Sequence, residues 1–276
     1  MPGLFIVNKT PKNRVIPAMN SDKQKLKNFL ETSVERYNDL RFIETDPITI
    51  PHLFNKKEDI EIAGFLTATI AWGQRAAIIS NAKKLMQWMD NAPYDFIIDF
   101  SEKDLLPFRK FVHRTFNGED CIHFLWALKN LCQKHGGLEM AFCNDFSVGE
   151  PDTKNAILLF RKRFLQLEHP QRIQKHLANP DKKSAAKRLN MFLRWMVRQD
   201  NKGVDFGIWK QIKPAQLICP LDVHSGRVAR KLGLLHRRAN DWQAACELSQ
   251  NLRQFDASDP IKYDYALFGL GVFEKY

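Results

Sequence analysis

The sequence predicts an all-α protein, and two observations support that class. Apolar residues recur three and four positions apart in several long segments, as they do along one face of a helix. Capping residues, glycine and proline separate these segments, and we find neither a series of β-hairpins nor a repeat of fixed period. With 276 residues, 44% of them hydrophobic, the chain can bury a substantial core. We expect residues 1–20 to form a poorly structured tail and residues 21–276 to form a single helical domain.

Proline, glycine and capping residues set the expected limits of the helices. Ser21 can cap the first helix, Asp46-Pro47 breaks the chain after it, and Asp59 is expected to cap an apolar helix. Gly136-Gly137 is typical of a helix end. We expect helices over residues 21–37, 60–74, 75–89, 108–116, 120–135, 153–167, 184–198, 222–234, 241–254 and 263–273.

Composition narrows the class of protein further. No apolar run reaches the roughly 18 residues that a membrane span needs, so we expect no membrane partner. The five cysteines are scattered without a CxxC pair, and the histidines form no set with metal-ligand spacing. We therefore expect a cytoplasmic protein that holds its cysteines reduced and uses no disulfide framework, metal site, metal cluster or cofactor.

The stretch from Lys182 to Arg198 combines an apolar face with a basic one. Helical spacing places a set of apolar side chains on one stripe: Ala185, Leu189, Phe192, Leu193 and Met196. The same spacing places a set of basic side chains on another face: Lys183, Lys187, Arg194 and Arg198. We expect the apolar face to pack in the core and the basic face to bind an anion.

Positive charge is concentrated around this stretch. The chain has a net charge of +11, and residues 154–198 alone hold twelve Lys or Arg against two acids, a net charge of +10. A second run without acids, residues 223–240, adds Arg227 and four further basic residues. The two runs flank an acid, Asp222, and clustered charge of this kind is typical of proteins that bind a polyanion. A solvated basic surface is the alternative, and we favour DNA as the partner.

Four segments in a fixed order carry a family resemblance. They are Phe65-Leu66-Thr67-Ala68-Thr69-Ile70-Ala71-Trp72-Gly73-Gln74, Phe111-Val112-His113-Arg114-Thr115-Phe116-Asn117-Gly118, Pro220-Leu221-Asp222-Val223-His224 and Tyr263-Asp264-Tyr265-Ala266-Leu267-Phe268-Gly269-Leu270-Gly271. This order resembles the helix-hairpin-helix DNA glycosylases, the superfamily of endonuclease III and the 8-oxoguanine glycosylases. The whole chain also resembles a family of conserved bacterial proteins of unassigned function. The glycosylase resemblance implies a two-lobed helical fold with DNA bound in the cleft between the lobes.

The segment that corresponds to the superfamily's hairpin departs from its pattern. The superfamily usually has a Gly-x-Gly hairpin whose backbone N–H groups bind a phosphate at a helix N-terminus. The equivalent loop here, residues 179–184, contains no glycine, and either candidate lysine lies further from Asp222 in sequence than in most of the superfamily. We therefore expect a degenerate helix-hairpin-helix.

The resemblance assigns catalytic roles to an acid and a lysine. Breaking an N-glycosidic bond leaves a positively charged sugar, which a fixed negative charge stabilises. By resemblance that charge is Asp222, and its alternative role is to cap the following helix. A lysine amine that attacks the sugar passes through a Schiff base, and neighbouring positive charge favours the reactive neutral amine. Lys183 matches the local pattern of the family, whereas Lys187 lies on the helix and is our first choice. Contact with phosphate is the alternative role for both.

The remaining candidate residues are contacts to DNA. Gln74 corresponds to the polar residue that faces the lesion or the orphaned base in the superfamily. The expected contacts to the DNA backbone are Lys182, Arg188, Arg194, Arg198, His224 and Arg227. Trp72, Trp195 and Phe192 could stack on an extruded base, although aromatic residues at helical spacing more often belong to the core.

The sequence therefore favours a DNA repair protein of the glycosylase type. We expect it to bind damaged duplex DNA and to remove a damaged base by hydrolysis of the N-glycosidic bond, with or without cleavage of the strand. The alternative is a non-catalytic nucleic-acid-binding protein on the same fold, which the missing hairpin glycines favour. A third interpretation makes the basic surface a site for RNA or for a protein partner, and the sequence identifies no particular protein.

Overall fold

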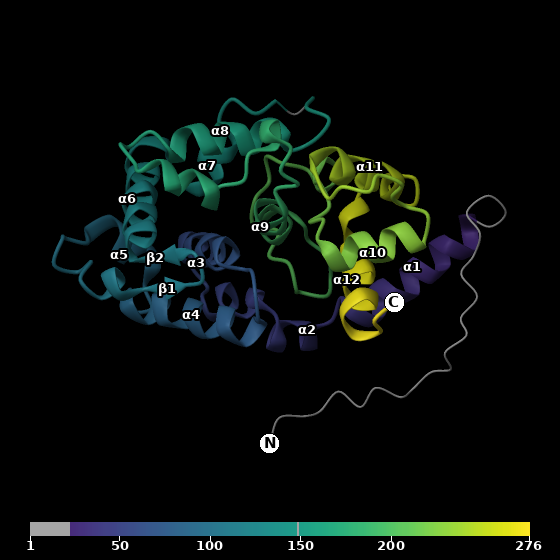
Figure 1. The fold of residues 1–276 in the computed structure, drawn as a ribbon, viewed down its shortest axis with the longest axis horizontal. Helices are drawn as coiled ribbons and strands as arrows, with labels where there is room; N and C mark the ends of the chain where they lie inside the picture. The colour runs from purple at the N-terminus through teal and green to yellow at the C-terminus, as the bar shows by residue number, and fades with distance from the viewer. Residues whose placement is uncertain (1–22, 148) are drawn as a thin grey trace, which may run out of the picture.

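The structure is a computed structural model that describes residues 23–147 and 149–276. The expected tail, residues 1–20, and the expected cap Ser21 lie outside the described residues. The all-α prediction is confirmed, because helices make up most of the described chain and the strands form only one short hairpin (Figure 1).

The helices and strands follow one another along the chain, and the longest connection covers residues 198–213. The α-helices are α1 (Lys23–Tyr37), α2 (Leu40–Thr45), α3 (Lys57–Thr69), α4 (Arg75–Trp88), α5 (Pro93–Asp99), α6 (Gly118–His135), α7 (Leu138–Cys143), α8 (Lys154–Phe164), α9 (Lys187–Val197), α10 (Val223–Lys231), α11 (Trp242–Arg253) and α12 (Tyr263–Phe273). The 3-10 helices are η1 (Pro47–Thr49), η2 (Pro51–Leu53), η3 (Pro107–Lys110), η4 (Gln171–His176), η5 (Pro180–Lys182), η6 (Pro214–Gln216) and η7 (Pro260–Lys262). The strands β1 (Val112–His113) and β2 (Phe116–Asn117) pair antiparallel.

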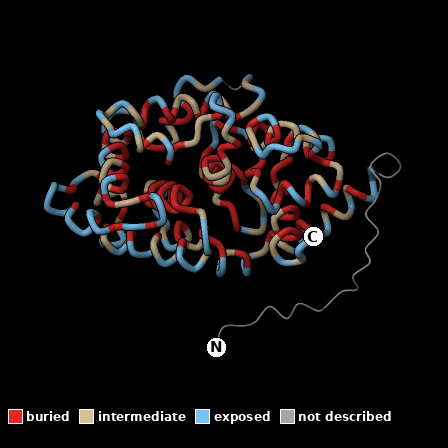
Figure 2. The backbone as a smooth tube through the Cα atoms, in the orientation of Figure 1, coloured by how far each residue is buried: buried red, intermediate tan, exposed pale blue. Residues whose placement is uncertain are grey.

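The helices lie in two groups with α9 between them (Figure 1). Helices α3 to α8 form one group, in which α6 packs against α5, α7 and α8. Helices α1, α10, α11 and α12 lie in the other group, in which α12 packs against both α1 and α10. Helix α9 packs against α3, and both are buried along most of their length (Figure 2).

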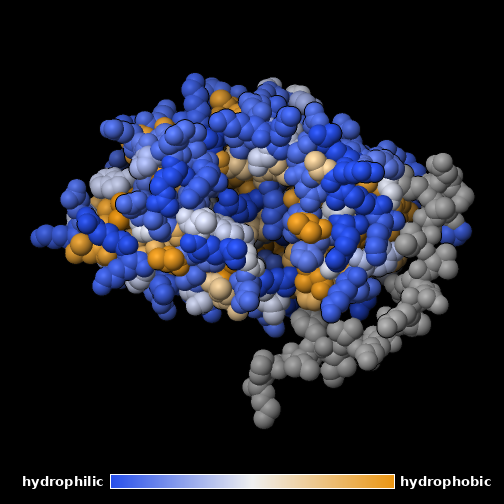
Figure 3. Space-filling view, viewed as in Figure 1, coloured by the Kyte–Doolittle hydropathy of each residue, from blue (hydrophilic) through white to orange (hydrophobic). Residues whose placement is uncertain are grey.

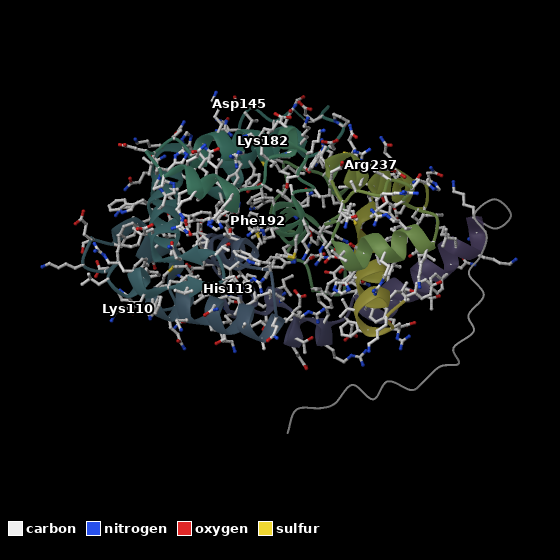
Figure 4. The ribbon with its side chains drawn as sticks, viewed as in Figure 1. Lys110, His113, Asp145, Lys182, Phe192 and Arg237 are labelled. Atoms are coloured by element: carbon white, nitrogen blue, oxygen red, sulfur yellow. The ribbon has the colours of Figure 1, made fainter. Side chains whose placement is uncertain are left out.

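The apolar stripe predicted for the basic stretch is confirmed as a buried face, although only four of its five members lie on α9, because Ala185 precedes the helix. All of its members are buried: Ala185, Leu189, Phe192, Leu193 and Met196. Phe192, which Figure 4 labels near the middle of the molecule, meets the Phe65 ring edge-on at 5.7 Å. Gly64 on α3 allows this approach, since a Cβ there would lie 3.1 Å from the Met196 methyl carbon. Packing of this kind fixes the position of α9, and truncation of a buried Phe costs about 3–5 kcal/mol.

Several expected helix limits are wrong, among them the end of the helix expected over 60–74, since α3 ends at Thr69. Helix α3 covers Lys57–Thr69, and Asp59 lies inside its first turn, where its carboxylate accepts the Tyr94 N–H at 2.8 Å. The helix expected over 108–116 is a short 3-10 turn followed by the β-hairpin, in which Phe116 is buried while Val112 is exposed. Helix α9 begins only at Lys187, because the preceding residue has left-handed backbone with φ 49°. Helices α2, α5 and α7 were not expected, since each is too short for a clear apolar period.

Membrane-spanning helices are absent from the part of the chain that the structure describes. None of its helices combines the length and the apolar character that a span requires.

Candidate active site

A cleft of about 780 Å³ opens between the two groups of helices. Figure 3 shows the surface hollowed in the middle of this face. The N-terminal ends of α4, α9 and α10 and one side of α12 contribute to the lining. The volume lies within the range of sites that hold small molecules or single groups of larger ones.

The cleft brings together the lysine and the acid that the sequence indicates. Lys187 is the first residue of α9, and Asp222 directly precedes α10. The Lys187 Nζ lies 3.6 Å from the Asp222 Oδ2, and the two side chains are 30% and 20% exposed. This is the distance of an ion pair and lies just beyond hydrogen-bond range, so a small rotation of either side chain or one bridging water would let a proton pass between them. The two groups can act together on one bound molecule.

Asp222 caps α10 and faces Lys187 at the same time. Its Oδ1 accepts the N–H groups of His224 and Ser225 at 2.8 and 2.9 Å. The Ser225 Oγ in turn accepts the Asp222 N–H at 2.9 Å, which completes a capping box. The predicted N-cap is therefore confirmed. Because the cap uses Oδ1, Oδ2 remains directed at the amine.

The loop before α9 explains why Lys187 and not Lys183 faces the acid. Lys183 and Ala186 both have left-handed backbone, with φ of 65° and 49°. The Trp242 N–H donates to the Lys183 carbonyl at 3.2 Å, which ties the loop to the start of α11. The Lys183 side chain is exposed and does not contribute to the lining of the cleft. The expected helical face shared by Lys183 and Lys187 is thus wrong, because Lys183 precedes the helix. A left-handed alanine is strained, and such strain is common beside functional groups.

Aromatic and basic side chains form the walls of the cleft. The Arg188 guanidinium lies 4.6 Å from the centre of the Trp72 ring, and that of Arg75 lies 4.9 Å from the centre of the Phe268 ring. Lys175 is exposed at the same cleft. Flat rings and cations arranged in this way can stack on a base and attract a phosphate.

Arg188 has a largely structural role within this wall. Its guanidinium donates to the carbonyl oxygens of Thr69 and His176, and burial lowers its pKa to about 10. No carboxylate forms an ion pair with Arg188 among the described residues. A half-buried positive charge without an acidic partner makes this wall of the cleft electropositive.

The expectation that Arg194 and Arg198 contact DNA is corrected by their burial. They are 4% and 2% exposed. Arg194 binds Asp205 at 3.2 Å and Asp264 at 2.5 Å. Arg198 also binds Asp205, at 3.1 Å, and its ion pairs extend to two further aspartates. Helical spacing placed them on one face correctly, but that face meets acids of the interior and not solvent.

The other expected contact residues lie around the cleft or away from it. His224 is exposed and lines the cleft, whereas Gln74 is exposed at the N-terminus of α4 between two residues that line it. Arg227 is exposed and donates to the Gly271 carbonyl at 3.0 Å. Lys182 is exposed at the end of η5, nearer the upper edge of the molecule in Figure 4. Trp195 is fully buried, so the suggestion that it stacks on a base is wrong.

The net charge of residues 154–198 suggests a larger positive surface than the structure has. Arg161 and Arg163 are also buried, where they donate to backbone carbonyl groups. The basic surface at the cleft is therefore made by fewer residues than the sequence suggests. Among the described residues, no group of three or more His, Cys, Asp or Glu side chains is placed to hold a metal ion.

Two acids at the inner end of the cleft were missed. Asp46 lines the cleft, but Asp46-Pro47 was interpreted only as a chain break. Asp264 is buried on α12, where burial raises its pKa to about 6 against the opposing charge of Arg194. A single acid within the apolar helix α12 was the available signal, since a buried charge needs a specific reason.

The fold and the cleft define a helical protein with a lysine–carboxylate pair in an open, partly basic cleft. The chain belongs to the family described as "Protein of unknown function (DUF2400)", which matches residues 46–273. These residues include the pair and most of the cleft lining. Comparison with curated proteins and with solved structures gave no match.

Proposed function

We propose that this protein binds DNA in the cleft and removes a damaged base, with Lys187 as the nucleophile and Asp222 as the stabilising charge. The observation that carries the proposal is the 3.6 Å separation of the Lys187 Nζ and the Asp222 Oδ2 in an open cleft. Amine attack on a sugar carbon needs such a pair, because positive charge develops on the sugar while the amine gives up protons.

The proposed chemistry follows from these positions. The neutral Lys187 amine attacks C1′ of the sugar, the C1′–N bond breaks, and its electron pair leaves with the base. The attached amine loses a proton to Asp222 Oδ2. As the C1′–O4′ bond of the sugar breaks, Asp222 passes this proton to the ring oxygen, the open chain becomes a Schiff base, and Asp222 is a carboxylate again. Water then hydrolyses the Schiff base and frees the lysine. Asp222 can act in these reaction steps without moving, because the hydrogen bonds that its Oδ1 accepts as a helix cap hold the carboxylate in place.

The surroundings of the pair support a nucleic acid as the substrate. Arg75 and Lys175 supply positive charge at the cleft, and Trp72 and Phe268 offer ring surfaces. Helix α9 has no side-chain cap, so its first backbone N–H groups and its positive dipole end favour a phosphate nearby. A DNA strand with one extruded base fits both features, because the base can stack on the rings while a neighbouring backbone phosphate binds at the positive charge.

The proposal is tested by trapping with borohydride on a duplex that contains an abasic site, together with a base-release assay on a panel of damaged duplexes. We expect wild type to form an adduct that reduction makes permanent, and Lys187→Ala to form none. Lys183→Ala is the matched control, because it removes an exposed amine four residues away that does not line the cleft.

The outcomes separate the candidate functions. Base release that needs Asp222 but gives no adduct means that water is the nucleophile. Binding of DNA without adduct or base release means a non-catalytic binding protein. An adduct that forms equally well with Lys187→Ala contradicts the assignment of the nucleophile.

A further inference from the structure

A small cavity lies at the inner end of the cleft, behind the lysine–carboxylate pair. It measures about 30 Å³, and Lys187, Asp222, Asp46 and Phe268 line both this cavity and the cleft. A cavity of this size with polar walls has room for one water molecule. A water molecule at this place would link the acids to the amine.

Asp46 presents an unused carboxyl oxygen to this space. The residue is 7% exposed, and it caps η1 through Oδ1, which accepts the Ile48 N–H at 3.1 Å. Its Oδ2 makes no hydrogen bond to any residue that the structure describes. The following Pro47 fixes the backbone here, and the carboxyl group is held at the wall by its cap.

The other two acids that line the cavity already form hydrogen bonds or ion pairs with both of their carboxyl oxygens. Asp264 Oδ2 accepts from Arg194 at 2.5 Å, and its Oδ1 accepts from the Cys219 thiol at 3.7 Å. Asp222 uses Oδ1 for its cap and has to be negatively charged while the C1′–N bond breaks, to stabilise the sugar. Asp46 alone among these three has both a free oxygen and no ion pair among the described residues.

Burial makes the carboxyl group of Asp46 harder to ionise than an exposed one. Burial raises the pKa of Asp46, while the Ile48 N–H and the charges of Arg194, Arg75 and Lys187 oppose that rise. Asp222 and Asp264 line the same cavity, together with the cations Lys187 and Arg194. A carboxyl group with a raised pKa that faces a reaction site is suited to give up a proton during the reaction.

We infer that Asp46 is a further catalytic residue, the general acid that protonates the departing base. The inference rests on the proposed function. As the C1′–N bond breaks, its electron pair goes to the base, and the Asp46 Oδ2 gives its proton to that base. The base leaves neutral and Asp46 becomes a carboxylate. It regains a proton from water that reaches it through the cavity, so that the cycle closes.

The chemistry of the leaving group provides the test. A neutral base such as 8-oxoguanine needs a proton to leave, whereas 7-methylguanine already carries a positive charge and leaves neutral without one. An abasic site has no base to release. We therefore compare Asp46→Asn with wild type on duplexes that contain 8-oxoguanine, 7-methylguanine or an abasic site. Asn caps a helix about as well as Asp, so the fold around η1 is preserved.

We expect Asp46→Asn to lose about 100-fold or more in the single-turnover release of 8-oxoguanine, as for removal of a general acid. Release of 7-methylguanine and borohydride trapping on the abasic duplex should stay close to wild type. Trapping also shows that the variant is folded. If the Asn variant unfolds at a lower temperature than wild type, the test is repeated with Asp46→Ser, because Ser is also a good helix cap.

Several outcomes overturn the inference. Equal release of 8-oxoguanine by wild type and Asp46→Asn contradicts it, and so does an equal loss on all three duplexes. A wild type that is trapped on the abasic duplex but releases neither base also overturns it, while the proposed nucleophile stands. A wild type with no adduct and no base release removes the proposed function itself.

Discussion

Replacement of Arg194 by Ala should destabilise the fold and not simply weaken DNA binding. The guanidinium is 4% exposed and pairs with Asp205 at 3.2 Å and with Asp264 at 2.5 Å. Those carboxylate side chains are 0% and 7% exposed, so neither can recover hydration when the arginine is removed. Removal of one partner from a buried ion pair costs about 3–5 kcal/mol, because the remaining charges stay buried without compensation.

The magnitude is large compared with the whole stability of a domain, which is about 5–15 kcal/mol. Urea denaturation followed by far-UV circular dichroism should show a midpoint well below that of wild type. Lys182→Ala, a basic residue of the same stretch that is exposed, should change the free energy of unfolding by no more than about 0.5 kcal/mol. A loss below about 1 kcal/mol for Arg194→Ala, combined with weaker DNA binding, would show that Arg194 reaches an anion in solution and that our account of α9 is wrong.

Three further predictions concern the cleft. Asp222→Asn should retain stability, because Asn caps as well as Asp, and should abolish base release; base release at the wild-type rate would reduce Asp222 to a cap. Lys175→Glu should flatten the dependence of log affinity for duplex DNA on log salt by about one unit, whereas Lys110→Glu, an exposed residue outside the cleft, should leave the slope unchanged. Burial raises the pKa of Asp264 from 3.8 to about 6, so the folded state binds this proton more tightly than the unfolded state. The stability that this proton adds to the folded state is complete below the pKa that Asp264 has in the unfolded chain. It is lost as pH rises through the pKa that Asp264 has in the folded state. In urea titrations between pH 4 and 7, the free energy of unfolding of wild type should therefore fall by up to about 3 kcal/mol relative to that of Asp264→Asn. If the two proteins show the same dependence of this free energy on pH, the raised pKa is contradicted.

Local patterns predicted the parts of the fold that depend on one segment at a time. The apolar stripe of α9 and the cap at Asp222 are determined by residues within a few turns of each other, so spacing and residue type were sufficient. The late start of α9 was not predictable in this way, because the left-handed Ala186 depends on a loop held by residues near Trp242.

The electrostatic part of the site needed the structure. Sequence spacing placed Arg194 and Arg198 on one face, but their partners come from residues such as Asp264, far along the chain. A count of charges therefore could not distinguish a surface from an internal ion-pair network. Asp46 was missed for the same reason, since a capping aspartate before proline has an ordinary local explanation and its place beside Lys187 comes only from the fold.

The central claim, that the Lys187 amine and the Asp222 carboxylate act together on a DNA sugar, is tested most directly by locating the covalent bond. The trapped complex with an abasic duplex is digested, and the modified peptide is identified by mass spectrometry. We predict that the reduced sugar is attached to Lys187, whose Nζ lies 3.6 Å from the Asp222 Oδ2. Attachment to Lys183, or to any lysine outside the cleft, would contradict the account.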